Sequence, residues 1–380
     1  MKLKQVICAI LCVGLCMAGC NMKREIVIEN GLKDGEITEN VHPVNISVEY
    51  GEGFDVEAIA DYFYGSTVED LVANSGATET GIVFQCEKDG IELTYDKEQN
   101  YLSLNDWREY AGNSYGNLLR QQFFFNEMSR RLMEWFPEGE LENYSSQKVV
   151  KACGQFANAC GYGEAQATVY AMELEGLWEA AKFMNQAGDF RSAPNPDYKY
   201  VSRNEINNAM EKGDTELALK LLKQKNSTPQ EAIEWEKKHE AYLLIYRTCA
   251  NGMLLDSKMH GMWCIYVPEY ERVVAAEVGC PLIVTNIEQE IELITKEEAV
   301  ANALPIIPVE SEEDITVTNI SLVYSPRSEQ LFDKETEVKV INPCWRIDYV
   351  IKEDKITTDQ YQNDDGTVLI NAVDGFEVEY

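Results

Sequence analysis

Histidine is scarce in this chain, with only three residues, His42, His239 and His260, among 380. Nucleophilic catalysis by a serine or cysteine paired with a histidine base needs one of them. His42 precedes a proline, where we expect exposure to solvent, and His239 falls at an expected helix end, which suits a cation. His260 lies in a predicted hairpin connection. We therefore expect no catalytic residue and no histidine-based metal site.

Paired cysteine motifs are absent as well. The chain has 11 cysteines but no C-x-x-C spacing, which would indicate a zinc site or a thioredoxin-like redox pair. Four cysteines fall in the first 20 residues, and the other seven are scattered through a long chain, unlike a disulfide framework. These seven are Cys86, Cys153, Cys160, Cys249, Cys264, Cys280 and Cys344. The sequence favours buried thiols and leaves open one or two bridges.

Positive charge is also in short supply, because 33 Lys and Arg stand against 65 Asp and Glu, a formal charge of −32. A surface this negative repels phosphate backbones, so we expect no nucleic-acid partner. Phosphate motifs are missing too, since Gly161-Tyr-Gly163 extends to neither nucleotide-binding pattern. With 45% apolar and 26% charged residues the composition is that of an ordinary folding chain, and its length favours two domains.

One long apolar run is present, at the start of the chain. Two lysines precede the stretch Val6–Met17, and the small residues Ala18-Gly19 then lead to Cys20, an arrangement typical of a secretory signal. Met17-Ala18-Gly19-Cys20 resembles the lipobox of bacterial lipoproteins, although Leu is more usual at its first position. The resemblance implies cleavage between Gly19 and Cys20 and a lipid, diacylglycerol with palmitate, on Cys20. A plain signal peptide cut at the same place is the alternative.

No further run of 18 apolar residues exists to cross a bilayer. The negative charge repels the body of the protein from an anionic membrane face, so the lipid has to hold it there. Each buried methylene contributes about 0.8 kcal/mol, so two or more acyl chains suffice. We expect 1–19 to be a lipoprotein signal peptide and 20–43 a tether. The remainder is then lipid-anchored at the outer face of the bacterial cell membrane.

The rest of the chain divides at the Pro-rich stretch Ser192–Pro196. We expect an N-terminal α+β domain at 44–192, a helical connector at 193–239 and a C-terminal α+β domain at 240–380. Alternation predicts a strand at 44–50, and the Asp89-Gly90 turn predicts an antiparallel meander over 81–105. The other elements expected in the N-terminal range are helices at about 55–64, 66–74, 117–135, 145–160 and 175–186 and a strand at 166–172.

Capping boxes predict helices in the connector, and a period of two begins near residue 241. The connector helices are expected at about 203–212, 215–225 and 229–239. The C-terminal elements are strands at 241–249, 262–267, 271–278 and 282–288, a helix at 295–304, and strands at 315–324, 344–351, 367–373 and 376–379. The predicted fold class is therefore α+β, with antiparallel sheets in two parts joined by a helical section.

Three motifs follow one another along the expected C-terminal strands: L-x-Y-x-P, P-x-W-R and N-A-x-x-G. Their residues are Tyr324, Pro326, Pro343, Trp345, Arg346, Asn371, Ala372 and Gly375. The set resembles PepSY-type modules and the extracytoplasmic regulators of envelope histidine kinases. The wider layout resembles a family of uncharacterised lipoproteins from anaerobic Gram-positive bacteria. The resemblance covers about 240–380 and little of 21–200, and it implies a small PepSY-like sheet at the C-terminus.

The chemistry of these motif residues indicates structural roles. Trp345 is large enough to fill the core between a sheet and a helix. Asn371-Ala372 allows close packing, and Asp374-Gly375 supplies a tight turn. Arg346 points to the opposite strand face from Trp345 and could pair with a carboxylate such as Asp348 or Glu377.

Two further segments have alternative interpretations. Asn363–Gly366 is acidic, but its spacing fails the EF-hand pattern, so we interpret it as a turn and expect no metal and no cofactor. Phe123–Phe125, with Met128, Leu132 and Trp135, gives a helix with an apolar face. Core packing is the expected role of that face, and a groove for a partner is the alternative.

Three functional hypotheses remain. The first is a non-enzymatic, membrane-tethered protein that binds or regulates another envelope protein. The second is a lipoprotein that binds a small solute in a cleft between its two parts. The third is an envelope hydrolase, which requires acids clustered in a pocket.

Overall fold

The computed structural model describes residues 44–51, 53–106, 108, 112–120, 135–187, 206, 208–210, 212–226, 235–256, 260–307, 315–325, 339–351 and 365–378. Helices and antiparallel strands share these ranges, so the predicted α+β class is confirmed. No helix in the described part of the chain is long and apolar enough to cross a membrane. Several predicted features lie outside the described residues: the leader with Gly19 and Cys20, His42, Phe123–Phe125, Ser192–Pro196 and Pro326.

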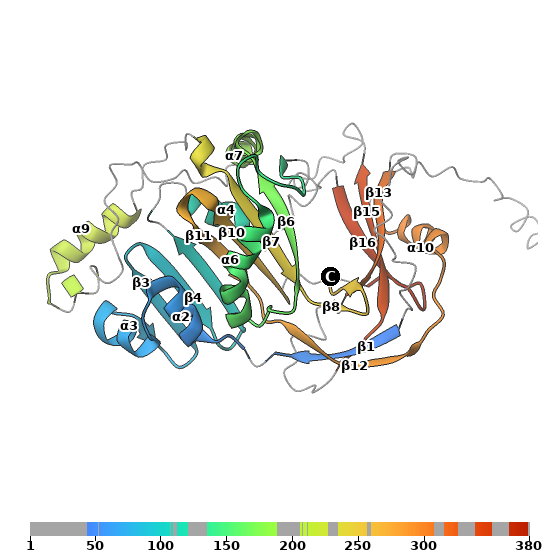
Figure 1. Ribbon diagram of the computed structural model, residues 1–380, viewed down its shortest axis with the longest axis horizontal. Coiled ribbons are helices and arrows are strands. Elements are labelled where there is room, and N and C mark those ends of the chain that lie inside the picture. The colour runs from blue at the N-terminus through green and yellow to red at the C-terminus, as the bar shows by residue number, and fades with distance from the viewer. Residues whose placement is uncertain are drawn as a thin grey trace, which may run out of the picture.

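The largest element is an antiparallel sheet of eight strands in the order β2-β3-β4-β5-β11-β10-β7-β6 (Figure 1). Its first half contains the predicted meander. Its second half consists of β11, β10 and β7, which follow the connector, and of β6, which precedes it. The strands are β2 (Thr78–Glu79), β3 (Val83–Lys88), β4 (Ile91–Asp96), β5 (Tyr101–Asp106), β6 (Gln166–Met172), β7 (Ala241–Arg247), β10 (Gly261–Val267) and β11 (Arg272–Val278).

Both faces of this sheet are covered, which is why β7 and β10 are apolar almost throughout rather than alternating. One face carries side chains such as Phe84, Leu104 and Leu244 and packs against α2 (Val56–Tyr64), α3 (Val68–Ser75) and α6 (Ser146–Ala159). The other carries side chains such as Leu243 and Ile265 and packs against α4 (Gly112–Arg120) and α7 (Leu174–Ala187). Figure 1 shows α6 lying across the sheet.

Short polar side chains cap the starts of three helices. Asp55 caps α2 by accepting from the Ala58 N–H at 3.0 Å. Thr67 caps α3, because its hydroxyl accepts from the Asp70 N–H at 3.1 Å. Thr295 and Glu298 form a capping box at α10 (Lys296–Ala303).

The first described strand pairs with two strands that come much later in the chain. β1 (Val44–Tyr50) pairs antiparallel with β12 (Leu282–Glu290) on one side and β14 (Lys339–Ile341) on the other. β5 likewise pairs with β11, and β6 with β7. Strands from 44–192 and from 240–380 therefore share two sheets, so strand pairing links the ranges that the sequence assigned to separate domains.

A second, smaller layer lies beyond β6 (Figure 1). β13 (Ile315–Tyr324), β15 (Pro343–Ile351) and β16 (Asp365–Asn371) form an antiparallel sheet in that order, and α10 covers one face of it. The strand predicted at 376–379 is reduced to a single bridge between Ile370 and Glu377. A short pair, β8 (Cys249–Ala250) and β9 (Met253–Leu254), follows β7 and packs against β1.

The connector is described only in part. α9 (Thr215–Asn226) matches the predicted helix at 215–225. The helix predicted at 229–239 is wrong at its described end, where 235–236 are irregular and only a short 3-10 helix, η2 (Lys237–His239), leads toward β7. Of the helix predicted at 203–212, the structure describes residue 206 and 208–210 as helical.

Candidate functional site

A cavity of about 400 Å³ lies between the large sheet and the uncovered face of the small sheet. The large sheet contributes Tyr170 from β6 and Arg247 from β7, and the chain after β8 contributes Leu254 and Asp256. The small sheet lines the cavity with Thr318, Asn319, Ser321, Val323, Arg346, Asp348, Tyr349, Gly366 and Thr367. The cavity therefore has polar walls supplied by segments far apart in the sequence.

Arg346 lies at the centre of the small-sheet wall. Its Nη1 is 2.7 Å from Asp256 Oδ2, and its Nε is 3.0 Å from Asp348 Oδ1. The Asp256 side chain is 7% exposed, whereas those of Asp348 and Arg346 are 22% and 23% exposed. One guanidinium thus binds two carboxylates, and these three side chains together carry a net charge of −1.

Strand register explains why Asp348 has a fixed position. Asn319, Asp348 and Thr367 stand opposite one another on β13, β15 and β16. The Asn319 amide donates to Asp348 Oδ2 at 2.9 Å, and the Thr367 hydroxyl donates to Asp348 Oδ1 at 2.6 Å. Together with Arg346, these donors hold the carboxylate in one orientation across all three strands.

Tyr324 and its neighbour hold the segment that carries Asp256. The Asp256 N–H donates to the Tyr324 carbonyl at 2.7 Å, and the Ser325 hydroxyl donates to the Asp256 carbonyl at 3.3 Å. The Tyr324 hydroxyl in turn donates to the Val44 carbonyl of β1 at 2.9 Å. Burial raises the pKa of Tyr324 to about 12, so at neutral pH this hydroxyl keeps its proton as a donor. Tyr324 is therefore a positioning residue for the cavity wall.

The opposite wall has a cation of its own. Arg247, the last residue of β7, lines the cavity, and among the described residues its guanidinium makes no ion pair. Tyr170 on the neighbouring strand is 5% exposed. Burial raises the pKa of Tyr170 to about 12, while the charges of Arg247 and Arg346 pull it the other way. Tyr170 is therefore neutral at physiological pH.

The other motif residues form the scaffold behind the cavity. Trp345 is buried against α10, and its Nε1 donates to the Ile294 carbonyl at 3.1 Å. The Ala372 N–H donates to the Pro343 carbonyl at 2.9 Å, and Asn371 Oδ1 accepts from the Val373 N–H at 2.9 Å. Gly375 has φ of 76°, a left-handed turn conformation that suits glycine. Of the predicted motif residues that the structure describes, only Arg346 lines the cavity.

The pairing of Arg346 with Asp348 is as the sequence suggested, because residues two apart on a strand share a face. Asp256 and Arg247 were not predicted. Asp256 lies 90 residues from Arg346, and no local pattern connects the two. The only available signal was the position of Arg247 as a cation that ends an otherwise apolar strand in an acidic chain.

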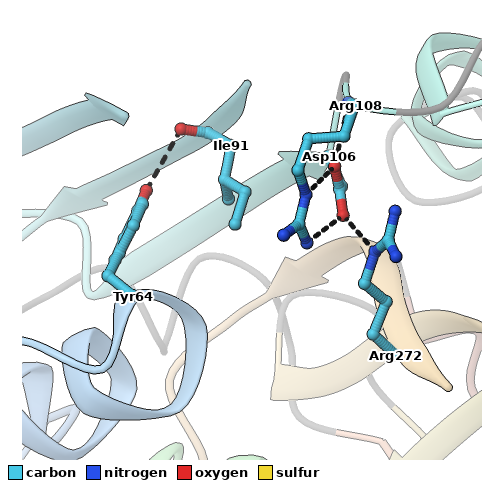
Figure 2. A network of polar contacts seen from close by, with 5 residues as sticks. All are labelled: Tyr64, Ile91, Asp106, Arg108 and Arg272. Atoms are coloured by element: carbon cyan, nitrogen blue, oxygen red, sulfur yellow. Dashed lines mark hydrogen bonds and ion pairs between the residues drawn. The ribbon is translucent and has the colours of Figure 1, made fainter. Parts of the chain in front are cut away.

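A second polar cluster lies at the end of β5 (Figure 2). Asp106, whose side chain is 1% exposed, accepts from Arg108 Nε at 2.9 Å and Nη2 at 2.6 Å and from Arg272 Nε at 2.7 Å. Beside this cluster, the hydroxyl of Tyr64 at the end of α2 donates to the carbonyl of Ile91 on the neighbouring strand β4 at 3.2 Å. These contacts join α2, β4, β5 and β11. The cluster is a structural clamp.

The two described histidines are buried and bonded to the backbone. His239 Nδ1 accepts from the Glu236 N–H at 2.9 Å, and the Tyr115 hydroxyl donates to the His239 carbonyl. His260 Nδ1 is 2.8 Å from the Cys280 carbonyl. Within the described ranges no group of three or more His, Cys, Asp or Glu could hold a metal ion.

The expectation of no catalytic serine overlooks one spacing. Gly112-Asn-Ser114-Tyr-Gly116 has the Gly-x-Ser-x-Gly pattern of a hydrolase nucleophile elbow. In the structure these residues form the first turns of helix α4, next to antiparallel strands, instead of a sharp turn after a parallel strand. Gly116 has a packing role, because a Cβ there would meet Asn105 Oδ1 on β5 at 2.0 Å. The pattern therefore lacks the structural setting of an elbow.

The seven cysteines outside the leader are free thiols, and six of them are buried. The bridges left open by the sequence are not formed. Burial raises the pKa of Cys280 to about 11 and also raises that of Cys160. Such thiols are unreactive at neutral pH because the thiolate is the nucleophile.

Comparisons with known proteins show no family for this chain. No model of a known protein family matches it, and no curated protein matches it. Among solved structures, an uncharacterised protein from Eubacterium rectale aligns over 90% of this chain and 86% of its own, with a TM-score of 0.47 and 11% identity. The C-terminal domain of YpeB from Bacillus megaterium aligns over 87% of this chain and 96% of its own, with a TM-score of 0.24 and 12% identity. At these scores no property of either protein is carried over to this chain.

Proposed function

We propose that this chain is a non-enzymatic, lipid-anchored extracytoplasmic protein that binds a small polar solute in the cavity between its two sheets. The observation that carries the proposal is the cavity itself. Its volume of about 400 Å³ falls in the range of small-ligand pockets, roughly 300–1,000 Å³. The side chains of Arg247, Arg346, Asp256 and Asp348 all line this one space.

The prearranged cavity wall supports binding. Asp348 is held by donors from three strands, and the segment of Asp256 is fixed to β13 through the backbone. Groups fixed before a ligand arrives lose little conformational entropy when it binds. Both carboxylates accept hydrogen bonds from Arg346, which further fixes the orientation of the wall.

The location outside the cell rests on the leader, the lipobox resemblance at Met17–Cys20 and the absence of a later apolar run. We also propose that the small sheet and α10 form a PepSY-like module. This part of the proposal is supported by the C-terminal motifs, which occupy that three-stranded sheet and its covering helix. In this proposal the small sheet serves as one wall of a binding site.

A thermal-shift screen of the full-length protein against polar metabolites tests the proposal. A ligand of the native state raises the unfolding midpoint. Ser321→Trp, which fills the cavity from the β13 wall, is expected to abolish the shift produced by any hit. Thr316→Trp on the same strand lies outside the cavity wall and is expected to preserve it. Hits that survive Ser321→Trp, or no hits at all, would count against a solute site between the sheets.

Docking on another envelope protein is the second candidate, and one surface feature favours it. Phe376 is 70% exposed and Val373 is 39% exposed, both on the turn after β16. Large apolar side chains gathered on one exposed turn suit a protein contact. Crosslinking from native membranes, compared between the natural chain and Phe376→Ser, tests this. Repeated recovery of the protein alone, or the same crosslinked products from both chains, would exclude that turn as the docking surface.

A further inference from the structure

One arginine differs from the others whose side chains the structure describes. Arg108, Arg272 and Arg346 each form ion pairs at 2.6–3.0 Å. Arg247 lines the cavity, and its half-buried guanidinium has no ion-pair or hydrogen-bond partner among the described residues. In a chain with 33 basic and 65 acidic side chains, an arginine at a cavity wall without an acidic partner is unusual. Its five N–H donors are available to a molecule that enters the cavity.

Strand alternation places Arg247 and Tyr170 on the same face of the large sheet. On β7 the side chains of Leu243 and Ile245 belong to the core on the side of α4 and α7, and Arg247 continues that row. Tyr170 on β6 belongs to the same core and stands opposite Leu243. The apolar face of the sheet thus ends at the cavity with a guanidinium and a phenol.

The Tyr170 hydroxyl is a second available donor. It makes no hydrogen bond to any residue in the described ranges, although Tyr170 is only 5% exposed. Burial raises the pKa of Tyr170 to about 12, against the opposing charges of Arg247 and Arg346, so the hydroxyl keeps its proton at pH 7. The charge of Glu138 also acts on this phenol, but Glu138 is exposed and does not line the cavity. A cationic fork and a neutral O–H both donate, so together they suit an anionic acceptor.

The acidic side chains of the cavity are engaged within its wall. Asp348 accepts from Arg346, Asn319 and Thr367, and Asp256 accepts from Arg346. The lining contains two arginines and two aspartates, whereas acids outnumber bases 65 to 33 in the whole chain. The cavity therefore does not share the acidic excess by which the protein as a whole repels anions.

We infer that the solute bound in this cavity carries an oxyanion, a carboxylate or a phosphate group, and that Arg247 binds it. The guanidinium fork matches two oxygens of such a group in a bidentate way, which a single positive point charge does not. The Tyr170 hydroxyl adds a neutral donor on the same side of the cavity. This inference rests on the proposed function and adds the chemical class of the solute.

Isothermal titration calorimetry on the detergent-purified full chain, at pH 7 and constant ionic strength, tests the inference. The probes are lactate in one arm and glycerol 3-phosphate in the other, with lactamide and glycerol as their uncharged counterparts. At least one of the two anions is expected to bind, and the arms decide between carboxylate and phosphate. The uncharged counterpart of that anion is expected to bind roughly tenfold more weakly or less, because it lacks the charge-assisted hydrogen bonds.

Three variants assign the roles. Arg247→Gln is expected to weaken the anion roughly tenfold or more and to leave its uncharged counterpart unchanged. Tyr170→Phe keeps the packing of the ring, loses only the donor, and is expected to weaken the anion about threefold. Lys148→Gln removes an equal charge from the exposed surface of α6 and is expected to leave the affinity unchanged. Thermal melts without ligand check that each variant is folded.

Three results would overturn the inference: equal affinity for an anion and its counterpart, no binding of either anion, or an unchanged affinity in Arg247→Gln. If neither anion binds but an uncharged metabolite raises the unfolding midpoint, and Ser321→Trp abolishes that effect, the cavity is a solute site and only the oxyanion inference is wrong. If an anion binds and Ser321→Trp leaves its affinity unchanged, the site is not this cavity and both proposals are wrong. Absence of binding in both experiments also contradicts both.

Discussion

Arg346 is the residue on which the geometry of the cavity depends. It is bonded to Asp256 and Asp348 and joins the segment after β9 to the small sheet. Because the Asp256 side chain is 7% exposed, its charge is largely withdrawn from water, and the Arg346 guanidinium at 2.7 Å contributes to its stabilisation. The ion pair therefore acts as a specific joint between two parts of the chain, beyond any contribution to overall stability.

Replacing Arg346 with Met is expected to lower the free energy of unfolding by about 2–4 kcal/mol, because it removes the guanidinium from two carboxylates in a semi-buried site. Urea denaturation measures the loss. Adding Asp256→Asn to Arg346→Met is expected to restore part of the lost stability, because the Asn amide leaves no unpaired charge in the semi-buried site. A loss below about 0.5 kcal/mol, or a double variant less stable than the single one, would contradict this role.

At the residue scale, the sequence predicts part of the candidate site and misses the rest for a clear reason. Arg346 and Asp348 are two positions apart on a strand, so their pairing follows from the alternation of side chains. Asp256 and Arg247 enter the site only through tertiary packing, which brings the segment after β9 and the end of β7 to a cavity lined by β13, β15 and β16. Local periodicity has no information on such contacts, so the cavity could not be assembled from the sequence.

At the scale of elements, helices and strand positions are predicted well and their partners are not. The predicted strand at 166–172 and the predicted helix at 145–160 agree with β6 and α6 to within a residue. Sequence alone did not pair β5 with β11 or β1 with β12, because neither alternation nor turn signals specify a partner some 170 residues or more away. In its described part, 376–378, the predicted strand at 376–379 is reduced to one bridge between Ile370 and Glu377.

Helix α6 offers a test of local energetics. Gly154 lies within α6, and a Cβ added there would have no neighbour within 4 Å. Gly154→Ala is therefore expected to raise the free energy of unfolding by about 0.5–1 kcal/mol, by reducing the freedom of the unfolded chain. Gly161→Ala, just after the same helix, is the matched contrast.

Gly161 has φ of 81°, and a Cβ there would lie 2.8 Å from Pro281 Cγ. Its replacement by Ala is expected to destabilise the protein, so thermal melts of the two variants should move in opposite directions. A stabilising effect at Gly161, or a destabilising one at Gly154, would show that the local backbone differs from the one described.

The hydrogen bond from Tyr324 on β13 to Val44 on β1 is expected to make the free energy of unfolding depend on pH in the alkaline range. Burial raises the pKa of Tyr324 to about 12, above its ordinary value of 10, and the hydroxyl donates to the Val44 carbonyl. The folded state thus holds this proton more tightly than the unfolded state, so the contribution is complete below pH 10 and is lost as the pH rises toward 12. Burial also raises the pKa of Tyr170 and that of Tyr242 to about 12.

Urea midpoints are therefore expected to fall steeply between pH 10 and pH 12. Tyr324→Phe loses one buried hydrogen bond, about 1 kcal/mol at pH 7, but should show a shallower alkaline decline because one titrating group is gone. If the natural chain and Tyr324→Phe decline in parallel above pH 10, this joint does not contribute to the pH dependence.

At the scale of the whole molecule, β1, the first described strand, is hydrogen-bonded to β12 and β14, which both belong to the last third of the chain. Tyr324 bonds β13 to the same strand. The Tyr324 hydrogen bond thus connects the sheet β12-β1-β14 to the small sheet, and the cavity lies between the small sheet and the large sheet. A solute bound there would contact both, which is why its binding is expected to stabilise the whole chain and not one part of it.

The charge of the whole molecule leads to a prediction about its attachment. With a formal charge of −32, the protein is repelled by an anionic membrane surface, so in the proposed lipoprotein only the acyl chains on Cys20 hold it there. Cys20→Ser is therefore expected to abolish palmitate labelling and to move the protein from the membrane fraction to the soluble fraction. Low salt should not restore attachment, because electrostatics oppose it, whereas a charge-bound protein would return to the membrane under those conditions. A natural chain that takes up no labelled palmitate, or a Cys20→Ser chain that stays on the membrane, would mean that Cys20 does not anchor this protein.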